Sequence, residues 1–145
     1  MKRCFFVGHR DAPDEILPQL TEIIEKLISE EGVKEFVVGR YGKFDHMAAR
    51  AVRAAKETDG DVRLVMMTPY HPAERSLTIP DGFDVILYPF ETAVPPRAAI
   101  VRANEQMIRT SSHLAAYVCH PGKARDFLEY ARRYNIKIMR IETGF

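Results

Sequence analysis

A strand-like run that ends in a glycine turn and leads directly into a helix pattern is the feature that most restricts how this chain can fold. Residues 36–38 are apolar, Gly39 and Gly42 bracket a tight turn, and Asp45 begins a run of helix-forming residues that reaches about Glu57. Glycine adopts positive φ angles and leaves room for a ligand beside the main chain. A helix after such a turn directs free N–H groups and the positive end of its dipole back at the turn, which favours an anion there.

The chain contains two more glycine turns of the same kind. Residues 2–7 form an apolar run that ends at Gly8, and residues 114–119 form another that leads into the turn at 120–123. Each turn is followed by apolar residues spaced as one face of a helix. One glycine turn is a weak sign of binding, because many such turns only connect a strand to a helix. Three of them predict a repeated strand–turn–helix arrangement.

Apolar runs alternate with helix patterns along the whole chain. The expected strands cover 2–7, 33–38, 62–67, 84–88, 114–119 and 136–141. Residues 68–83 carry three prolines and little periodicity, which predicts a long loop. Strands that alternate with helices form a parallel sheet covered on both faces. We therefore expect an α/β protein with a Rossmann-like three-layer sandwich and a mostly parallel sheet.

The three glycine turns are expected to form one binding site. In open parallel sheets, ligands bind beyond the carboxyl ends of the strands, at the point where the strand order reverses. All three turns follow strand ends, so we expect all three to lie at that one edge. The predicted ligand-binding residues of the turns are Gly8, His9, Arg10, Gly39, Arg40, Tyr41, Gly42, Phe44, Asp45, Pro121, Gly122, Lys123 and Ala124.

Several of these residues have a second, purely structural interpretation. Arg10 either holds a phosphate or is a structural partner of Asp45, and Asp45 either binds a ribose hydroxyl or only caps its helix. His9 either donates to a ligand or is simply a neutral, hydrogen-bonded histidine in a loop. Lys123 follows Gly122 at a helix start, where a cation opposes the helix dipole, so its position is easier to explain if an anion binds there.

The helix expected over about 95–110 contributes two further candidates. Arg97 lies in its first turn, near the expected ligand edge. Asn104 shares a face with Ile100 and Val101, which we expect to point inward. Asn104 is therefore either a buried polar group bonded to the backbone or a ligand contact.

The cysteines and histidines show no metal-binding motif. The chain has 2 cysteines and 5 histidines, without HExxH or paired CxxC spacing. Cys4 and Cys119 lie in apolar runs and are expected to be reduced core thiols of a cytoplasmic protein. Cys119 and His120 are expected to point to opposite faces of one strand, which argues against a Cys–His nucleophile pair. We therefore expect neither a metal nor a cofactor.

Composition and charge exclude several classes of partner. The net charge of +1 gives no electrostatic case for binding nucleic acid or an anionic membrane. No apolar run approaches the roughly 20 residues of a membrane span, and the first run is too short for a signal peptide. A length of 145 residues fits one domain over 1–145. No P-loop motif supports a kinase or NTPase.

Three groups of residues follow one another in a recognisable order. They are Gly8-His9-Arg10, then Val38-Gly39 with Gly42, Phe44 and Asp45, then Val94-Pro95-Pro96-Arg97 with Asn104, Met107 and Ile108. Their order and spacing resemble the SLOG superfamily, which includes the DNA-processing protein A and the LOG phosphoribohydrolases. The resemblance covers nearly the whole chain and is closest to small stand-alone bacterial members. It implies a homodimer that binds or senses a nucleotide or nucleotide-derived ligand at the glycine edge.

Two departures separate the chain from the LOG enzymes, which cleave the N-glycosidic bond of nucleoside 5'-monophosphates. LOG enzymes place an arginine before the lysine of a helix motif, where this chain has Ala103, with Arg102 one residue earlier. Their third turn precedes a catalytic glutamate, whereas 121–126 here has one glycine and no glutamate. Glycosidic hydrolysis generally relies on carboxylates, so we favour binding and keep hydrolysis as the alternative. The sequence leaves open the base, the number of phosphates and whether turnover occurs.

Overall fold

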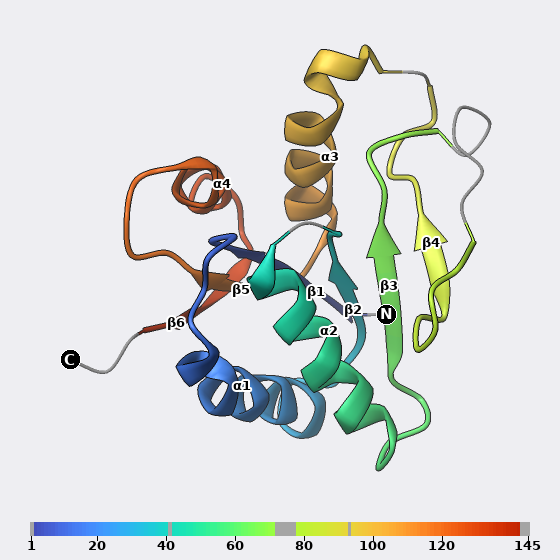
Figure 1. Ribbon diagram of the computed structural model, residues 1–145, viewed down its shortest axis with the longest axis vertical. Helices are drawn as coiled ribbons and strands as arrows, with labels where there is room; N and C mark the ends of the chain where they lie inside the picture. Colours follow the sequence, from blue (N-terminus) through green and yellow to red (C-terminus); the bar gives the residue numbers. More distant parts are fainter. Residues whose placement is uncertain (1, 41, 72–77, 93, 143–145) are drawn as a thin grey trace.

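Helices and strands alternate along the computed structural model, which describes residues 2–40, 42–71, 78–92 and 94–142 (Figure 1). The strands are β1 (Lys2–Gly8), β2 (Val33–Val38), β3 (Arg63–Met67), β4 (Val85–Leu87), β5 (His113–Tyr117) and β6 (Lys137–Ile141). The helices are α1 (Leu17–Ser29), α2 (Lys43–Lys56), α3 (Pro96–Thr110) and α4 (Lys123–Ala131), with a short 3-10 turn at Asp14–Ile16 before α1. None of the described helices has the length and apolar content that crossing a membrane requires.

All six strands form one parallel sheet in the order β4-β3-β2-β1-β5-β6. The chain adds strands outward on one side from β1 to β4, and then returns to the other side of β1 for β5 and β6. The strand order therefore reverses between β1 and β5, whose last aligned pair is Gly8 and Tyr117. The predicted Rossmann-like architecture with a parallel sheet is confirmed.

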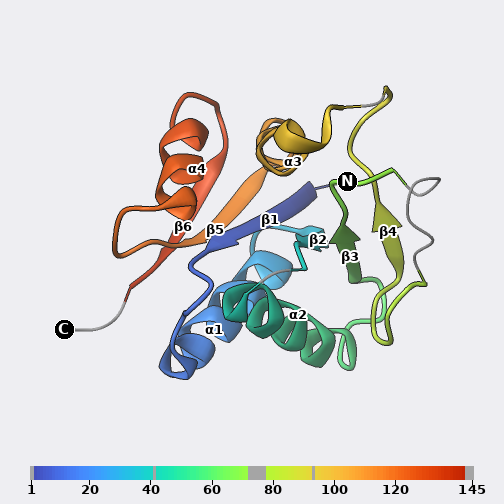
Figure 2. The same ribbon diagram turned by 45° about the horizontal axis from the view of Figure 1, so that its top comes forward.

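The sheet is the middle layer of three, with α1 and α2 on one face and α3 and α4 on the other (Figure 2). Side chains alternate along β1, because successive residues of a strand point to opposite faces. Cys4 and Phe6 belong to the core that α1 and α2 cover, and Phe5 and Val7 belong to the core under α3 and α4. Burial on both faces explains why the strand reads as a continuous apolar run.

The start of α2 differs from the prediction. The helix begins at Lys43, and its N-cap is Gly42, which has a φ of 96°. Asp45 therefore lies in the first turn and does not cap the helix. Gly42 occupies the cap because a positive φ costs glycine little. A Cβ on Gly42 would also lie 2.8 Å from the Cα of Arg10, so this glycine is required for packing as well.

The buried face of α3 also differs from the prediction. Ala99, Ala103, Met107 and Ile108 are buried, whereas Ile100 is 40% exposed and Val101 is 37% exposed. The helix thus turns its small alanines toward the sheet. Ile100, one residue after Ala99, is rotated by about 100° away from that face.

The last part of the fifth expected strand does not belong to the sheet. β5 ends at Tyr117, opposite the end of β1, so Val118 and Cys119 continue beyond it without strand pairing. Cys119 is exposed, whereas Cys4 is fully buried, and both are free thiols. The prediction of a core thiol is correct for Cys4 and wrong for Cys119.

The long loop expected over 68–83 is described only in part, because 72–77 lie outside the described residues. The remaining parts, 68–71 and 78–83, hold no helix or strand. Thr68 is fully buried and donates its backbone N–H to the carbonyl oxygen of Leu87 at 2.9 Å. This bond ties the start of the loop to the end of β4.

The end of β1 lies directly beneath the first turn of α2. A Cβ on Gly8 would lie 2.4 Å from the ring of Phe44, and that ring is only 1% exposed. Phe44 also packs against Phe6 and Tyr117, with ring centroids 6.3 Å apart in both pairs. Phe44 is thus a core residue that depends on the missing side chain of Gly8.

Replacing Gly8 with alanine should destabilise the fold by about 1–3 kcal/mol, because the added methyl group would force the buried Phe44 ring to move. Gly60→Ala is the matched control, since no heavy atom lies within 4 Å of a Cβ placed there. We expect the control to change stability by no more than about 0.5 kcal/mol. Urea unfolding of both variants measures the difference, and equal stabilities would contradict this account of the contact.

Candidate functional site

A cavity of about 680 Å³ opens at the edge of the sheet where the strand order reverses. It is bordered by segments that follow β1, β2, β3 and β5, and by α3. Ten of the predicted site residues line it, namely Gly8, His9, Arg10, Gly39, Arg40, Asp45, Asn104, Gly122, Lys123 and Ala124. The fold thus brings all three glycine turns to one cavity.

Four predicted site residues in the described part of the chain do not line the cavity. Phe44 and Gly42 are packing residues, as described above, and Pro121 is exposed on the approach to α4. Arg97 is exposed in the first turn of α3 and is not among the lining residues. Tyr41 lies outside the described residues.

The cavity also has lining residues that the sequence interpretation missed. They are Phe6, Val7, Asp11, Met67, Pro69, Tyr70, Ile100, His120 and Phe127. Asp11 and His120 directly neighbour predicted residues, and the segment 67–70 follows β3 at the same edge, so the strand-end rule could have identified them. Ile100 was assigned to the core, because its spacing alone does not distinguish a sheet-facing position from a cavity-facing one.

The first two glycine turns are joined through the backbone. The N–H of Lys43, in the first turn of α2, donates to the carbonyl oxygen of Arg10 at 2.9 Å. This bond satisfies one of the N–H groups that a helix start leaves free. It also places the segment after β1 beside the start of α2, so Arg10 and Asp45 border the same cavity.

Two helix starts, those of α2 and α4, lie at the cavity edge. Both have a glycine at the N-cap, Gly42 and Gly122, and neither is capped by a side-chain hydrogen bond in the described residues. Gly122 has a φ of 149°, with no heavy atom within 4 Å of a Cβ placed there. The space at this cap is therefore open on the side where an L-residue would carry its side chain. Free N–H groups and the helix dipole favour an anion at such a position.

The charged side chains of the cavity wall have both signs. Arg10, Arg40 and Lys123 supply three cations, and all three are exposed. Asp11 and Asp45 supply two carboxylates. The carboxylate of Asp45 lies close to the main chain at the end of β2, since a Cβ on Gly39 would be 3.0 Å from its Oδ2. The wall can therefore attract an anionic group and accept hydrogen bonds from hydroxyl groups.

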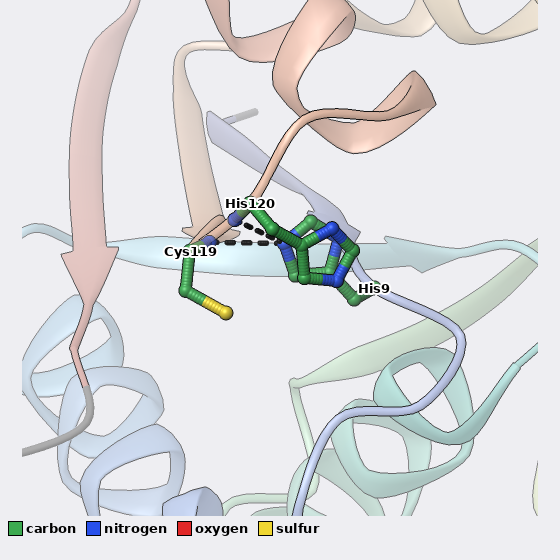
Figure 3. Close-up of side chains that lie close together, drawn as sticks. All are labelled: His9, Cys119 and His120. Atoms are coloured by element: carbon green, nitrogen blue, oxygen red, sulfur yellow. Dashed lines mark hydrogen bonds between the residues drawn. The ribbon is translucent and has the colours of Figure 1, made fainter.

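His9 connects the segment after β1 to the segment after β5 (Figure 3). Its Nε2 accepts hydrogen bonds from the backbone N–H groups of Cys119, at 2.9 Å, and His120, at 3.3 Å. The His9 ring stacks on the ring of His120 with centroids 3.5 Å apart, and meets the Tyr117 ring edge-on at 5.6 Å. The ring is only 5% exposed.

These hydrogen bonds determine the protonation state of His9. A nitrogen that accepts two hydrogen bonds carries no proton, so the neutral ring holds its proton on Nδ1. Burial lowers the pKa of His9, the nearby His120 lowers it further, and the carboxylate of Asp11 opposes both effects. All observations agree on a neutral His9 near pH 7.

The donor atoms of His9, Cys119 and His120 lie within 4.8 Å of one another, as in many metal sites. The prediction that Cys119 and His120 point to opposite faces of a strand is therefore wrong, because both lie beyond the end of β5. A metal at Nε2 of His9 would displace both backbone hydrogen bonds. A metal at Nδ1 would require the ring proton to be on Nε2, where it would point at the same two backbone N–H groups. The hydrogen bonding thus favours a structural role for His9 over metal binding.

In the folded protein, Cys119 should be the one thiol that reacts quickly with Ellman's reagent. Cys119 is exposed, whereas Cys4 is fully buried, and burial raises the pKa of the Cys4 thiol. Because the thiolate is the reactive form, Cys4 should react only after unfolding. Absorbance should report one fast equivalent per chain for the native protein and none for Cys119→Ser. Two fast equivalents in the native protein would contradict the described burial.

Comparison with known proteins does not assign the chain to a family. No model of a known protein family matches it. A search of curated proteins also found no match. What the chain binds is therefore inferred from the cavity and from the residues that line it.

Proposed function

We propose that this protein binds or senses a nucleotide or nucleotide-derived ligand in the cavity at the carboxyl edge of the sheet. One observation carries the proposal: glycine turns from three separate segments border a single cavity at the reversal of strand order. Parallel α/β sheets commonly bind ligands at this position. The volume of about 680 Å³ lies within the usual range for small-molecule sites.

The segment that begins α4 offers the best position for a phosphate group. Gly122 leaves the helix start open, and the N–H groups there combine with the positive end of the dipole. Lys123 adds a cation in the first helical turn, where it opposes the dipole unless an anion lies between them. Arg10 supplies a second cation to the wall of the same cavity.

The rest of the cavity suits a nucleoside. Asp45 can accept hydrogen bonds from ribose hydroxyl groups, the interaction expected of it from the sequence. An apolar and aromatic part of the wall is provided by β3 and the segment after it, by α3 and by α4, through Met67, Tyr70, Ile100 and Phe127. Asn104 donates to the carbonyl oxygen of Ile100 at 2.8 Å, which leaves its side-chain oxygen as an acceptor for a polar ligand group.

Hydrolysis of a nucleoside 5'-monophosphate at its N-glycosidic bond is the alternative function. It is favoured by the presence of two carboxylates, Asp11 and Asp45, in the described wall of the cavity. Release of free base and ribose 5-phosphate from a nucleoside monophosphate distinguishes the enzyme from a binding module. Membership of the SLOG superfamily is part of the same proposal and rests on the motif order in the sequence.

Thermal denaturation against AMP, ADP, ATP, NAD and ADP-ribose tests the proposed function. A ligand present at 100 times its dissociation constant should add about 2.7 kcal/mol to the apparent free energy of unfolding. Lys123→Ala should weaken binding about tenfold or more, because it removes a charged hydrogen-bond donor. At the same ligand concentration, a tenfold loss would reduce the added stability to about 1.4 kcal/mol.

Lys26→Ala is the matched control for the ligand experiment. Lys26 is an exposed lysine in the last turn of α1, paired with Glu22 at 3.5 Å, and it does not line the cavity. Its removal should leave the ligand-induced stabilisation unchanged. The proposal fails if no ligand of the panel stabilises the wild-type protein, or if Lys123→Ala and Lys26→Ala lose the same amount of ligand-induced stabilisation.

We further propose that the protein acts as a cytoplasmic homodimer. Ile79, in the loop over 68–83, is 48% exposed, and Val101 and Tyr134 are also exposed apolar side chains. Sedimentation should therefore detect a species of twice the 16.6 kDa chain mass. Ile79→Lys should shift this equilibrium toward the monomer, because it places a charge in the expected interface. A single monomeric species of the wild type at tens of micromolar would refute the dimer.

A further inference from the structure

We propose that His9 is a positioning residue: its neutral ring holds the β5–α4 turn in the form that binds the ligand, and its protonation releases that turn. The inference rests on the proposed function, because it concerns the same cavity. It assigns His9 one of the two roles that the sequence left open. In this role the imidazole shapes the binding surface through the backbone and does not contact the ligand as a donor.

The contacts of His9 join two distant parts of the chain. Its Nε2 accepts from the N–H groups of Cys119 and His120, which are 110 and 111 residues further along. These two N–H groups lie past the end of β5, so the sheet does not supply their partners. The same short segment leads to Gly122 and the start of α4. His9 therefore controls the backbone that presents the proposed phosphate position.

Protonation of His9 is incompatible with this arrangement. The imidazolium ion has a proton on both ring nitrogens and accepts no hydrogen bond. Nε2 would then point an N–H group at two other N–H groups. Both acceptor bonds would be lost, and two backbone donors would need new partners. We expect the segment at 119–122 to rearrange to satisfy them, because both bonds are partly buried and a donor that is shielded from water and has no partner is costly.

The groups around His9 determine whether a positive charge on its ring would be stabilised. The ring of His120 stacks on it, the edge of Tyr117 faces it, and the backbone of Cys119 donates to it. The pKa of Tyr117 is raised to about 12, first by the hydrogen bond from the Cys119 thiol and then by burial, so this phenol is neutral below pH 8. Asp11 is the nearby carboxylate, and its Oδ1 lies 3.7 Å from Nε2 of His120. Arg10 and Lys123 add positive charge to the same wall.

A charged His9 has two opposing effects on an anionic ligand. Its charge would attract the ligand, but the ligand already meets Arg10, Arg40 and Lys123 in the cavity wall. The loss of two backbone hydrogen bonds would at the same time deform the turn that leads into α4. Because Nε2 points at backbone N–H groups in a ring that is 5% exposed, we expect the deformation to outweigh the attraction.

The folded protein should consequently lose stability as the pH falls. The pKa of His9 is lowered from its ordinary value of 6.5, chiefly by burial. Below pH 6.5 the unfolded chain therefore binds a proton that the folded chain resists, which favours unfolding. His9→Gln removes the pH dependence of stability that comes from His9. It also keeps a hydrogen-bond acceptor, because the glutamine Oε1 can lie near the position of Nε2. His9→Leu removes the acceptor at every pH.

The first experiment requires no ligand. Long-range proton–nitrogen NMR of 15N-labelled protein at pH 7.5 should show that His9 carries its proton on Nδ1. During titration toward pH 5, the amide signals of Cys119, His120 and Gly122 should shift together with the His9 ring signals. In His9→Gln these amides should not follow that titration. A His9 proton on Nε2, or amides that ignore the His9 titration, would overturn the proposal.

The second experiment measures AMP affinity between pH 5 and 8 for wild type, His9→Gln and His9→Leu. The phosphate of AMP also titrates in this pH range. The pH profile of His9→Gln measures this contribution of the ligand, because the same ligand is used for both proteins. Relative to His9→Gln, wild-type affinity should fall by up to tenfold for each pH unit below the pKa of His9. His9→Leu should bind weakly throughout this range.

Each outcome of the affinity measurement decides between the two roles of His9. Wild-type affinity that rises relative to His9→Gln as the pH falls would show a cationic ligand contact, and would overturn the positioning role. Coincident pH profiles would also overturn it. If AMP binds neither protein at any pH, the binding part of the inference falls for this nucleotide, and inorganic phosphate is the second probe. The tautomer and amide measurements still decide whether His9 holds the turn, independently of the proposed function.

Discussion

The contact between Gly8 and Phe44 is the constraint on which the cavity depends. Since Gly8 has no side chain, the ring of Phe44 can lie against the end of β1 and anchor the first turn of α2. The same turn is tied to the segment after β1 by the bond from Lys43 to Arg10. These two contacts bring the Arg10 and Asp45 segments to one edge, so the shape of the cavity wall relies on the packing of Phe44 beneath it.

The strands and the edge of the sheet could be predicted because they follow from local patterns. Apolar runs, glycine turns and helix periodicity are properties of neighbouring residues, and they were sufficient to identify the parallel sheet and ten of the residues that line the cavity. The orientation of α3 could not be predicted in this way, since the apolar pattern allows either Ala99 or Ile100 to face the sheet. Only the close packing of alanines against the sheet decides between them.

The residues around His9 were beyond prediction for a different reason. Cys119 continues the apolar pattern of β5, so the predicted strand reached it and His120 followed directly, but β5 ends where its neighbour β1 ends. Their backbone N–H groups consequently need partners outside the sheet, and a histidine from the other end of the chain provides one. Pairings of this kind depend on which strands become neighbours, and no local pattern encodes that information.

The position of β1 in the middle of the sheet has a consequence for the order of assembly. One edge of β1 pairs with β2, which is the next strand along the chain. The other edge pairs with β5, which lies more than a hundred residues later. Contacts between such distant segments form slowly, because a long loop must close first. On the ribosome, the strands from β1 to β4 can assemble with α1 and α2 before β5 is synthesised. The cavity wall would then be completed last, when the C-terminal third of the chain docks onto the open edge of β1.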